Sequence, residues 1–208
     1  MTAPLPIAPP VAHDEGRRAA SVLDGVASVL VIGRDPALAA WVALGMARAQ
    51  AERRRVAVAD LVGEVAPLAT LVADDDDPHG ISDSFLYGVS LNRIARPVDG
   101  APNLFVLPSG SEAVATAEIF GSDRWRRLAA GFREVGALLV LVAHADTPGL
   151  DALAASVDGV VVAGDASGAL PDAEPPLAVV GAGARRTRPA SERPAPDDRE
   201  ALAAVAAA

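Results

Sequence analysis

Residues 27–64 read ASVLVIGRDPALAAWVALGMARAQAERRRVAVADLVGE, and this stretch sets the fold. It opens with a short apolar run, Ala27–Ile32, whose length and β-branched content predict a strand. The segment Ala37–Gln50 carries apolar residues at the spacing that is typical of a helix. Between the two, Asp35 has the side chain of an N-cap and Pro36 suits the first helical position. The stretch therefore predicts a strand, a sharp turn and a helix in direct succession.

The same alternation continues along the chain. A second clear helix is expected at Asp123–Glu134, where apolar residues recur at helical spacing. Strands that alternate with helices form parallel βαβ units, with helices on both faces of the sheet. We therefore expect an α/β fold, with a doubly wound and mainly parallel sheet flanked by helices. The further expected strands are Val56–Ala59, Leu104–Leu107, Ala137–Val142, Gly159–Ala163 and Leu177–Val180.

Both ends of the chain are expected to lie outside the folded domain. Residues 1–14 and 184–208 are rich in Pro, Ala and mixed charge, with too few large apolar side chains to offset the entropy lost on ordering. Within them, Met1–Val11 and Arg185–Pro196 should be the protease-sensitive parts, and Asp197–Ala208 has the composition of a short helix. One domain is left between the two tails.

The composition excludes several classes of function. All 18 residues counted as Lys or Arg are arginines, so no mechanism can use a lysine ammonium. The net charge of −9 disfavours a general nucleic-acid coat or an anionic membrane surface. Without cysteine there is no disulfide and no thiolate metal site. The sequence has neither a signal-peptide pattern nor the roughly 18 apolar residues in succession that a membrane span needs, so we expect a cytoplasmic protein.

A longer block carries a family resemblance. Residues 80–132 read GISDSFLYGVSLNRIARPVDGAPNLFVLPSGSEAVATAEIFGSDRWRRLAAGF. This block resembles the MinD/ParA-like P-loop ATPases and, within them, the tyrosine-kinase-like domains of bacterial capsule and exopolysaccharide synthesis. The resemblance extends from about Ala20 to Gly181 and implies a P-loop NTPase-like fold. The segments that match in order and spacing are Gly80–Asp83, Leu91–Ile94, Asn103–Gly110 and Glu118–Ser122.

The loop that should bind phosphate departs from the family pattern. A working loop reads G-x-x-x-x-G-K-[ST], in which the lysine neutralises the terminal phosphates and the hydroxyl binds Mg²⁺. Here Gly33 keeps the first glycine, but Leu38 stands at the second, Ala39 at the lysine and Ala40 at the hydroxyl. We therefore expect neither a catalytic residue nor a bound cofactor.

The residues between Gly33 and the helix bear on nucleotide binding in two opposite ways. Asp35 would occupy the N–H groups of the helix start and place a negative charge where a phosphate should sit. Pro36 removes another donor. The alternative is that Arg34 replaces the missing lysine, because the guanidinium is itself a good phosphate ligand, so that ATP and Mg²⁺ still bind.

Other acidic residues could belong to the same vestigial site. Asp60 falls where the resemblance places an aspartate that organises Mg²⁺, and either Asp146 or Ala143 falls at the second such position, the Walker B aspartate. A carboxylate at a strand end can equally meet solvent or cap a helix. His144 is more readily a loop histidine than a base, since no activated nucleophile is identifiable near it.

One acidic run remains, at Asp74–Asp77 with His79 beside it. It is more typical of a solvated loop than of a metal site, so we expect no metal.

These observations predict a pseudo-enzyme. We expect a catalytically inactive domain that acts as a regulatory or scaffolding protein in exopolysaccharide or capsule biosynthesis. The family's substrate tail of clustered tyrosines is also missing, since Tyr87 is the only tyrosine. The alternatives are a divergent ATPase or tyrosine kinase that uses Arg34, and a ParA/MinD-like positioning factor.

The resemblance also implies partners. In the family the domain docks on a membrane chain-length regulator and oligomerises around the nucleotide. The expected partner is therefore that regulator or an active paralogue, with a homo-oligomer as a further expectation. Neither nucleic acid nor direct membrane insertion is expected, and the protein would lie at the inner membrane only through its partner.

Overall fold

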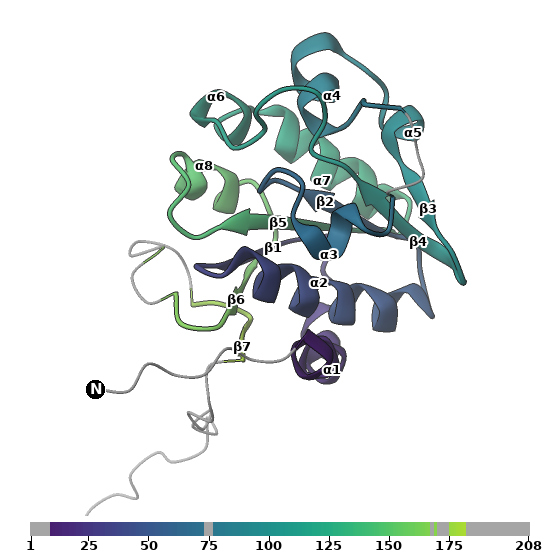
Figure 1. The fold of residues 1–208 in the computed structure, drawn as a ribbon, viewed down its shortest axis with the longest axis vertical. Coiled ribbons are helices and arrows are strands. Elements are labelled where there is room, and N and C mark those ends of the chain that lie inside the picture. Colours follow the sequence, from purple (N-terminus) through teal and green to yellow (C-terminus); the bar gives the residue numbers. More distant parts are fainter. Residues whose placement is uncertain (1–8, 73–76, 167–168, 170–174, 182–208) are drawn as a thin grey trace, which may run out of the picture.

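The computed structural model describes residues 9–72, 77–166, 169 and 175–181 (Figure 1). A seven-stranded sheet crosses this part of the chain in the order β3-β4-β2-β5-β1-β6-β7, and all neighbouring strands are parallel except β3 and β4. The predicted α/β fold with a mainly parallel sheet is confirmed. The strands are β1 (Ser28–Gly33), β2 (Val56–Asp60), β3 (Arg96–Val98), β4 (Ala101–Leu107), β5 (Leu138–His144), β6 (Val160–Ala163) and β7 (Ala178–Val180).

The first strand, β1, lies at the centre of the sheet between β5 and β6. All six of its residues are buried, as expected for a parallel strand covered on both faces. Its last residue, Gly33, lies opposite His144 at the end of β5. Because parallel strands end at one edge of the sheet, the loops after β1, β2 and β5 all open on the same side.

Helices cover both faces of the sheet (Figure 1). The helices α1, α2 and α3 pack on one face, and α4 to α8 lie on the other. The predicted helices at Ala37–Gln50 and Asp123–Glu134 correspond to α2 and α7 and are confirmed. The helices are α1 (Pro9–Ala19), α2 (Pro36–Ala51), α3 (Ala66–Ala69), α4 (Ile81–Tyr87), α5 (Leu91–Ile94), α6 (Ala117–Phe120), α7 (Arg124–Glu134) and α8 (Leu150–Ala154), with a 3₁₀ turn at Ala20–Leu23.

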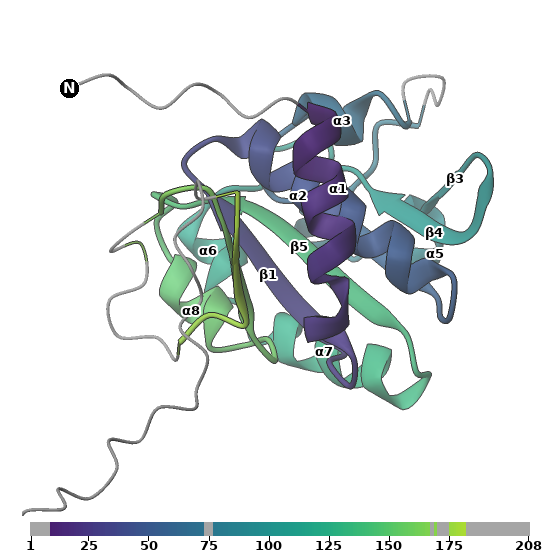
Figure 2. The same cartoon turned by 90° about the horizontal axis from the view of Figure 1, so that it is seen from below.

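Helix α1 lies against α2, and two glycines set the distance between them (Figure 2). A Cβ atom on Gly16 would lie 2.3 Å from the carbonyl oxygen of Val42, and one on Gly45 would lie 2.0 Å from that of His13. The expected N-terminal tail is therefore wrong over residues 9–14, which belong to α1. The contact is made by glycines, so α1 lacks the large apolar residues at helical spacing that would have indicated a packed helix. The rest of that tail, residues 1–8, and the tail at 184–208 lie outside the described residues.

Among the described strands, β3 is the one that the sequence did not predict. It holds only Arg96–Val98, includes Pro97, and pairs antiparallel with β4 through a tight hairpin. A proline confines such a strand to the edge of a sheet, and β3 is the edge. Its short length and proline give it no strand pattern that could be recognised in isolation.

The close contact of α1 with α2 gives a first prediction. Gly16→Ala should lower the free energy of unfolding by about 1–3 kcal/mol, because the added methyl overlaps backbone that cannot move aside. Gly131→Ala is the matched control: it lies in α7 with nothing within 4 Å of the new Cβ, and should be neutral or stabilise by up to about 1 kcal/mol. Urea titrations of both variants measure the difference. Equal effects would contradict the packing described for α1.

Candidate functional site

The candidate site is the connection between β1 and α2, which consists of two residues. The strand ends at Gly33 and the helix begins at Pro36, so only Arg34 and Asp35 lie between them. A phosphate-binding loop needs several residues between strand and helix to wrap its N–H groups around the ligand. Here residues 36–40, which correspond to most of that loop, already belong to the helix.

Asp35 caps the helix as the sequence predicts. Its Oδ1 accepts hydrogen bonds from the backbone N–H groups of Ala37, at 3.0 Å, and Leu38, at 3.1 Å. The backbone of Asp35 is extended, as an N-cap requires, and Pro36 occupies the first turn.

The cap uses the donors that a phosphate would need. Pro36 has no N–H, and those of Ala37 and Leu38 are bound to the Asp35 side chain. The next N–H, of Ala39, donates to the Asp35 carbonyl oxygen at 3.1 Å. An anion at this helix end would have to displace a carboxylate that is part of the chain, and would meet its negative charge.

The lysine and hydroxyl positions of the family pattern face the interior. Ala39 and Ala40 are each 0% exposed and pack in the core between α2 and the sheet. A lysine or serine in either place would enter apolar surroundings instead of a ligand pocket. The direction of the helix thus turns both positions toward the core.

The two glycine positions of the family pattern, Gly33 and Leu38, are packed against the end of β6. A Cβ on Gly33 would lie 2.9 Å from the carbonyl oxygen of Ala163, so only glycine fits where β1 passes the end of β6. Leu38, at the second glycine position, lies over Gly164: a Cβ on that glycine would be 2.9 Å from a methyl of Leu38. An apolar side chain thus occupies space beside the helix start.

Arg34 points across the ends of the neighbouring strands. Its Nε lies 3.7 Å from the Asp146 carboxylate, and its Nη1 donates to the backbone oxygen of Asp165 at 3.5 Å. Both side chains of the ion pair are about half exposed, so the pair is weak in energy but directs the guanidinium toward the loops after β5 and β6.

Asp60 has a structural role. The side chain is 2% exposed at the end of β2, and its two oxygens accept hydrogen bonds from the N–H groups of Val62, Gly63 and Val65 at 2.8–3.1 Å. These bonds hold a turn in which Gly63 and Glu64 both have positive φ angles. The carboxylate fixes the chain direction after β2.

The two alternatives for the second aspartate position lie in different places. Ala143 is buried inside β5, opposite Ile32, whereas Asp146 is exposed in the turn after the strand and contacts Arg34. His144 closes that turn, since its Nδ1 accepts the N–H of Asp146 at 3.1 Å. The structure therefore brings Arg34 and Asp146 together and leaves Asp60 to a loop of its own.

The expected acidic run is only partly described. Asp74–Asp76 lie outside the described residues, while Asp77 contacts the His79 imidazole. The hydrogen bonds from the side chain and backbone of His79 lower the pKa of Asp77 to about 2. In the part of the chain that the structure describes, no three His, Cys, Asp or Glu side chains gather where they could share a metal ion.

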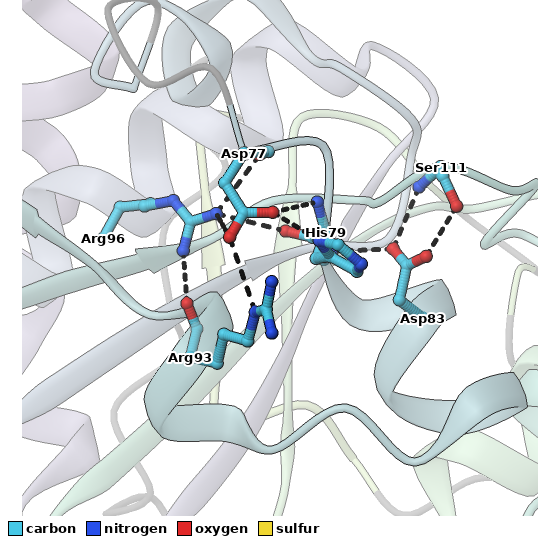
Figure 3. Close-up of polar contacts among 7 residues, drawn as sticks. Asp77, His79, Asp83, Arg93, Arg96 and Ser111 are labelled. Carbon is cyan, nitrogen blue, oxygen red and sulfur yellow. Dashed lines mark hydrogen bonds and ion pairs between the residues drawn. The ribbon is translucent and has the colours of Figure 1, made fainter.

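A second polar cluster, which the sequence did not predict, joins two of the family-like segments (Figure 3). The buried Asp83 carboxylate accepts the N–H of Gly80 at 2.8 Å and both the N–H and the hydroxyl of Ser111, at 3.0 and 2.5 Å. Arg96, with a side chain only 8% exposed, donates to the carbonyl oxygens of Arg93 and Asp77.

The cluster holds the two neighbouring loops together. Gly80 and Gly110 allow the chains to touch, because a Cβ on either would lie 2.3 Å from an atom of the other segment. An aspartate three residues after the glycine that begins α4 is the one sequence signal that could have indicated Asp83. Its partner is 28 positions away and has no such signal.

Known proteins match this chain in structure but not in sequence. No protein-family model matches the sequence, and no curated protein matches it. Solved structures do match: the VpsO kinase domain superposes with a TM-score of 0.63 at 17% identity, over 74% of this chain and 79% of that one. The chain has the fold of a bacterial tyrosine-kinase domain.

Two further structures with this tyrosine-kinase fold agree. The kinase domain of the Escherichia coli tyrosine kinase ETK gives a TM-score of 0.55 at 18% identity, over 67% of this chain and 56% of that one. The chimerical protein CapA2B2 gives 0.58 at 16% identity, over 71% and 68%. The fold expected from the sequence resemblance is thus confirmed. Among the described residues, no helix is long and apolar enough to cross a membrane.

The helix cap gives a second prediction. Asp35→Ala should lower the free energy of unfolding by about 0.5–2 kcal/mol, because two backbone donors lose their acceptor. Asp35→Ser, which keeps a capping oxygen, should remain within a few tenths of a kcal/mol of wild type. Thermal melts of the three proteins measure this. If the serine variant falls as far as the alanine variant, the carboxylate has a role other than capping.

The Asp83 cluster gives a third prediction, which depends on pH. Burial alone would raise the pKa of Asp83, but the hydrogen bonds from Ser111 and Gly80 outweigh it and leave the pKa below its usual range. A lowered pKa means that the carboxylate stabilises the fold fully above the unfolded pKa of about 4, and that this contribution is lost as the pH falls through the folded value. Asp83→Asn should therefore cost about 1–3 kcal/mol at pH 7 and progressively less below pH 4.

Denaturant titrations between pH 3 and pH 7 follow this difference. Asp99→Asn, at an exposed hairpin residue, is the control and should show little effect at either pH. A cost of Asp83→Asn that does not change with pH would mean that the asparagine disturbs packing rather than removing a charge.

Proposed function

We propose that this chain is a catalytically inactive tyrosine-kinase-like domain that acts as a regulatory or scaffolding protein in exopolysaccharide or capsule biosynthesis. The observation that carries the proposal is the cap: Asp35 uses the N–H groups at the start of α2 and places a negative charge there. The buried positions of Ala39 and Ala40 support it, because neither can present a side chain to a phosphate.

The assignment to polysaccharide synthesis rests on the resemblance of residues 80–132 and on the kinase fold. The order of Gly80–Asp83 and Asn103–Gly110 belongs to that subgroup. Here the two segments are hydrogen-bonded to each other, because the N–H groups of Ile81 and Ser82 donate to the carbonyl oxygens of Pro108 and Ser109 at 2.8 and 2.9 Å. Such a domain would act by contact with another protein. A membrane chain-length regulator or an active kinase of the same fold is the partner that the resemblance favours.

Arg34 offers the alternative of a divergent nucleotide site. Against it, the guanidinium already faces Asp146 and the Asp165 carbonyl oxygen, and Asp35 stands between it and the helix end. A phosphate would gain one cation and meet two carboxylates. The charges around Arg34 therefore favour a domain that does not bind nucleotide.

A ligand-dependent melt tests the proposal and is our fourth prediction. Wild type and Arg34→Ala are melted with and without millimolar ATP and Mg²⁺. A site of micromolar affinity would add about 4 kcal/mol at a thousandfold excess of ligand. We expect no shift in either protein. An ATP-dependent shift in wild type that Arg34→Ala abolishes would overturn the inactive reading and make Arg34 the substitute cation.

The regulatory half of the proposal is tested in cells. Deletion of the gene should change the amount or length of the exported polysaccharide, and Arg34→Ala should restore it as well as wild type does. Unchanged polysaccharide after deletion would remove the assignment to this process. Restoration by wild type but not by Arg34→Ala would point back to a nucleotide-dependent role.

A further inference from the structure

An apolar groove lies between α5 and α7, on the face of the sheet opposite α1 and α2. It has a volume of about 360 Å³ and extends over the starts of β2 and β5 and the end of β4. We call it the α5–α7 groove. Val135, at the end of α7, is 77% exposed there, the highest exposure of any large apolar side chain among the described residues. The main apolar side chains that line it are Leu91, Phe105, Leu107, Leu128, Phe132 and Val135.

Two arginines line the same groove. Within the described part of the chain, neither Arg55 nor Arg127 forms an ion pair or a hydrogen bond through its guanidinium, and both residues are exposed. Of the other eleven arginines that the structure describes, nine contact a carboxylate, a hydroxyl or a carbonyl oxygen, and Arg18 and Arg48, which do not line the groove, make no such contact. The nine are Arg17, Arg34, Arg53, Arg54, Arg93, Arg96, Arg124, Arg126 and Arg133. The groove thus combines an apolar floor with uncompensated positive charge, in a protein whose net charge is −9.

The chain itself contains a segment with the complementary pattern. Residues 197–208 read DDREALAAVAAA, with three carboxylates in the first four positions and then two large apolar residues among alanines. Leu202 and Val205 are the only large apolar residues after Gly181, and their spacing places them on one face of a helix. Alanine has the highest helix propensity, and carboxylates are favoured in the first turn.

The length of the chain allows this segment to reach the groove. The described part ends at Gly181, and residues 182–196 can extend by at most about 50 Å. A domain of this size is roughly 40 Å across. The connecting residues contain four arginines and three prolines and no large apolar residue, so they do not compete for the apolar groove.

We propose that residues 197–208 form a helix that packs in the α5–α7 groove of the same chain. The face with Leu202 and Val205 would cover the apolar floor. The acidic first turn would lie beside Arg55 and Arg127, so that both the apolar surface and the positive charge are compensated by one segment. The groove is then an intramolecular docking site for the C-terminal segment, separate from the β1–α2 connection.

Disulfide trapping in the full-length chain tests this placement, because the natural sequence has no cysteine. One variant carries Val135→Cys in the groove and Ala206→Cys, one helical turn beyond Leu202. The matched control carries Val179→Cys, which is 52% exposed on β7, with the same Ala206→Cys. Residue 179 is much nearer to 206 along the chain, so random collisions favour the control pair.

We expect the 135–206 disulfide to form within one chain and faster than the 179–206 disulfide, as followed by non-reducing gels and mass spectrometry. Equal rates, or faster closure of the control pair, would overturn the proposal. Disulfide-linked dimers that persist on dilution would also overturn it, and would assign the groove to the tail of a second copy.

Charge reversal supplies a second readout. Arg55→Glu together with Arg127→Glu should lower the rate of 135–206 closure about fivefold, since two ion pairs become repulsive. Adding Asp197→Arg and Asp198→Arg should restore most of it.

The control for this arm reverses two arginines elsewhere. Arg18→Glu together with Arg126→Glu changes the net charge equally, at residues that do not line the groove. This pair should leave the closure rate unchanged. If it slows closure as much as the groove variant, or if the compensating charges fail to restore it, the contact of Arg55 and Arg127 with the acidic turn is excluded.

Discussion

The carboxylate of Asp35 accepts two backbone hydrogen bonds at the start of α2, and the position of that helix determines much of the rest. With only two residues between β1 and α2, the first turn lies directly against the central strands, and Ala39 and Ala40 enter the core. A longer, glycine-rich connection would leave a shallow space at the same sheet edge. The distance between strand and helix therefore decides whether this edge is a ligand site or part of the packed interior.

Small side chains make such close packing possible. Ten of the sixteen residues of α2 are buried, and six of those ten are alanine or glycine, including Gly45 at the contact with α1. With layers this close, β1 is buried on both faces by α2 on one side and α7 on the other. Aromatic residues gather on the second face, where Phe85 stacks on Trp125 and Arg124 lies over the Phe85 ring. The two faces of the sheet thus use different packing, one of small residues and one of rings.

The sequence predicted the elements that are recognisable from neighbouring residues alone. Runs of β-branched residues marked six strands, and the pair Asp35 and Pro36 marked the start of α2, because capping depends on adjacent residues. Helix α1 and strand β3 were missed, since a glycine contact and a proline-containing edge strand have no apolar periodicity. The link between Asp83 and Ser111 depends on residues that the fold alone brings together. The burial of Ala39 could not be predicted either, because it depends on how α2 packs against the sheet and not on the residue type.

Helix α1 contacts both α2 and the edge strand β7, so the first and the last described elements lie side by side. Both ends of the domain therefore leave from the same margin of the sheet (Figures 1 and 2). The hairpin of β3 and β4 forms the opposite margin. A tether attached at the N-terminal end would therefore hold the domain by this margin, with the β3–β4 hairpin oriented away from the attachment point.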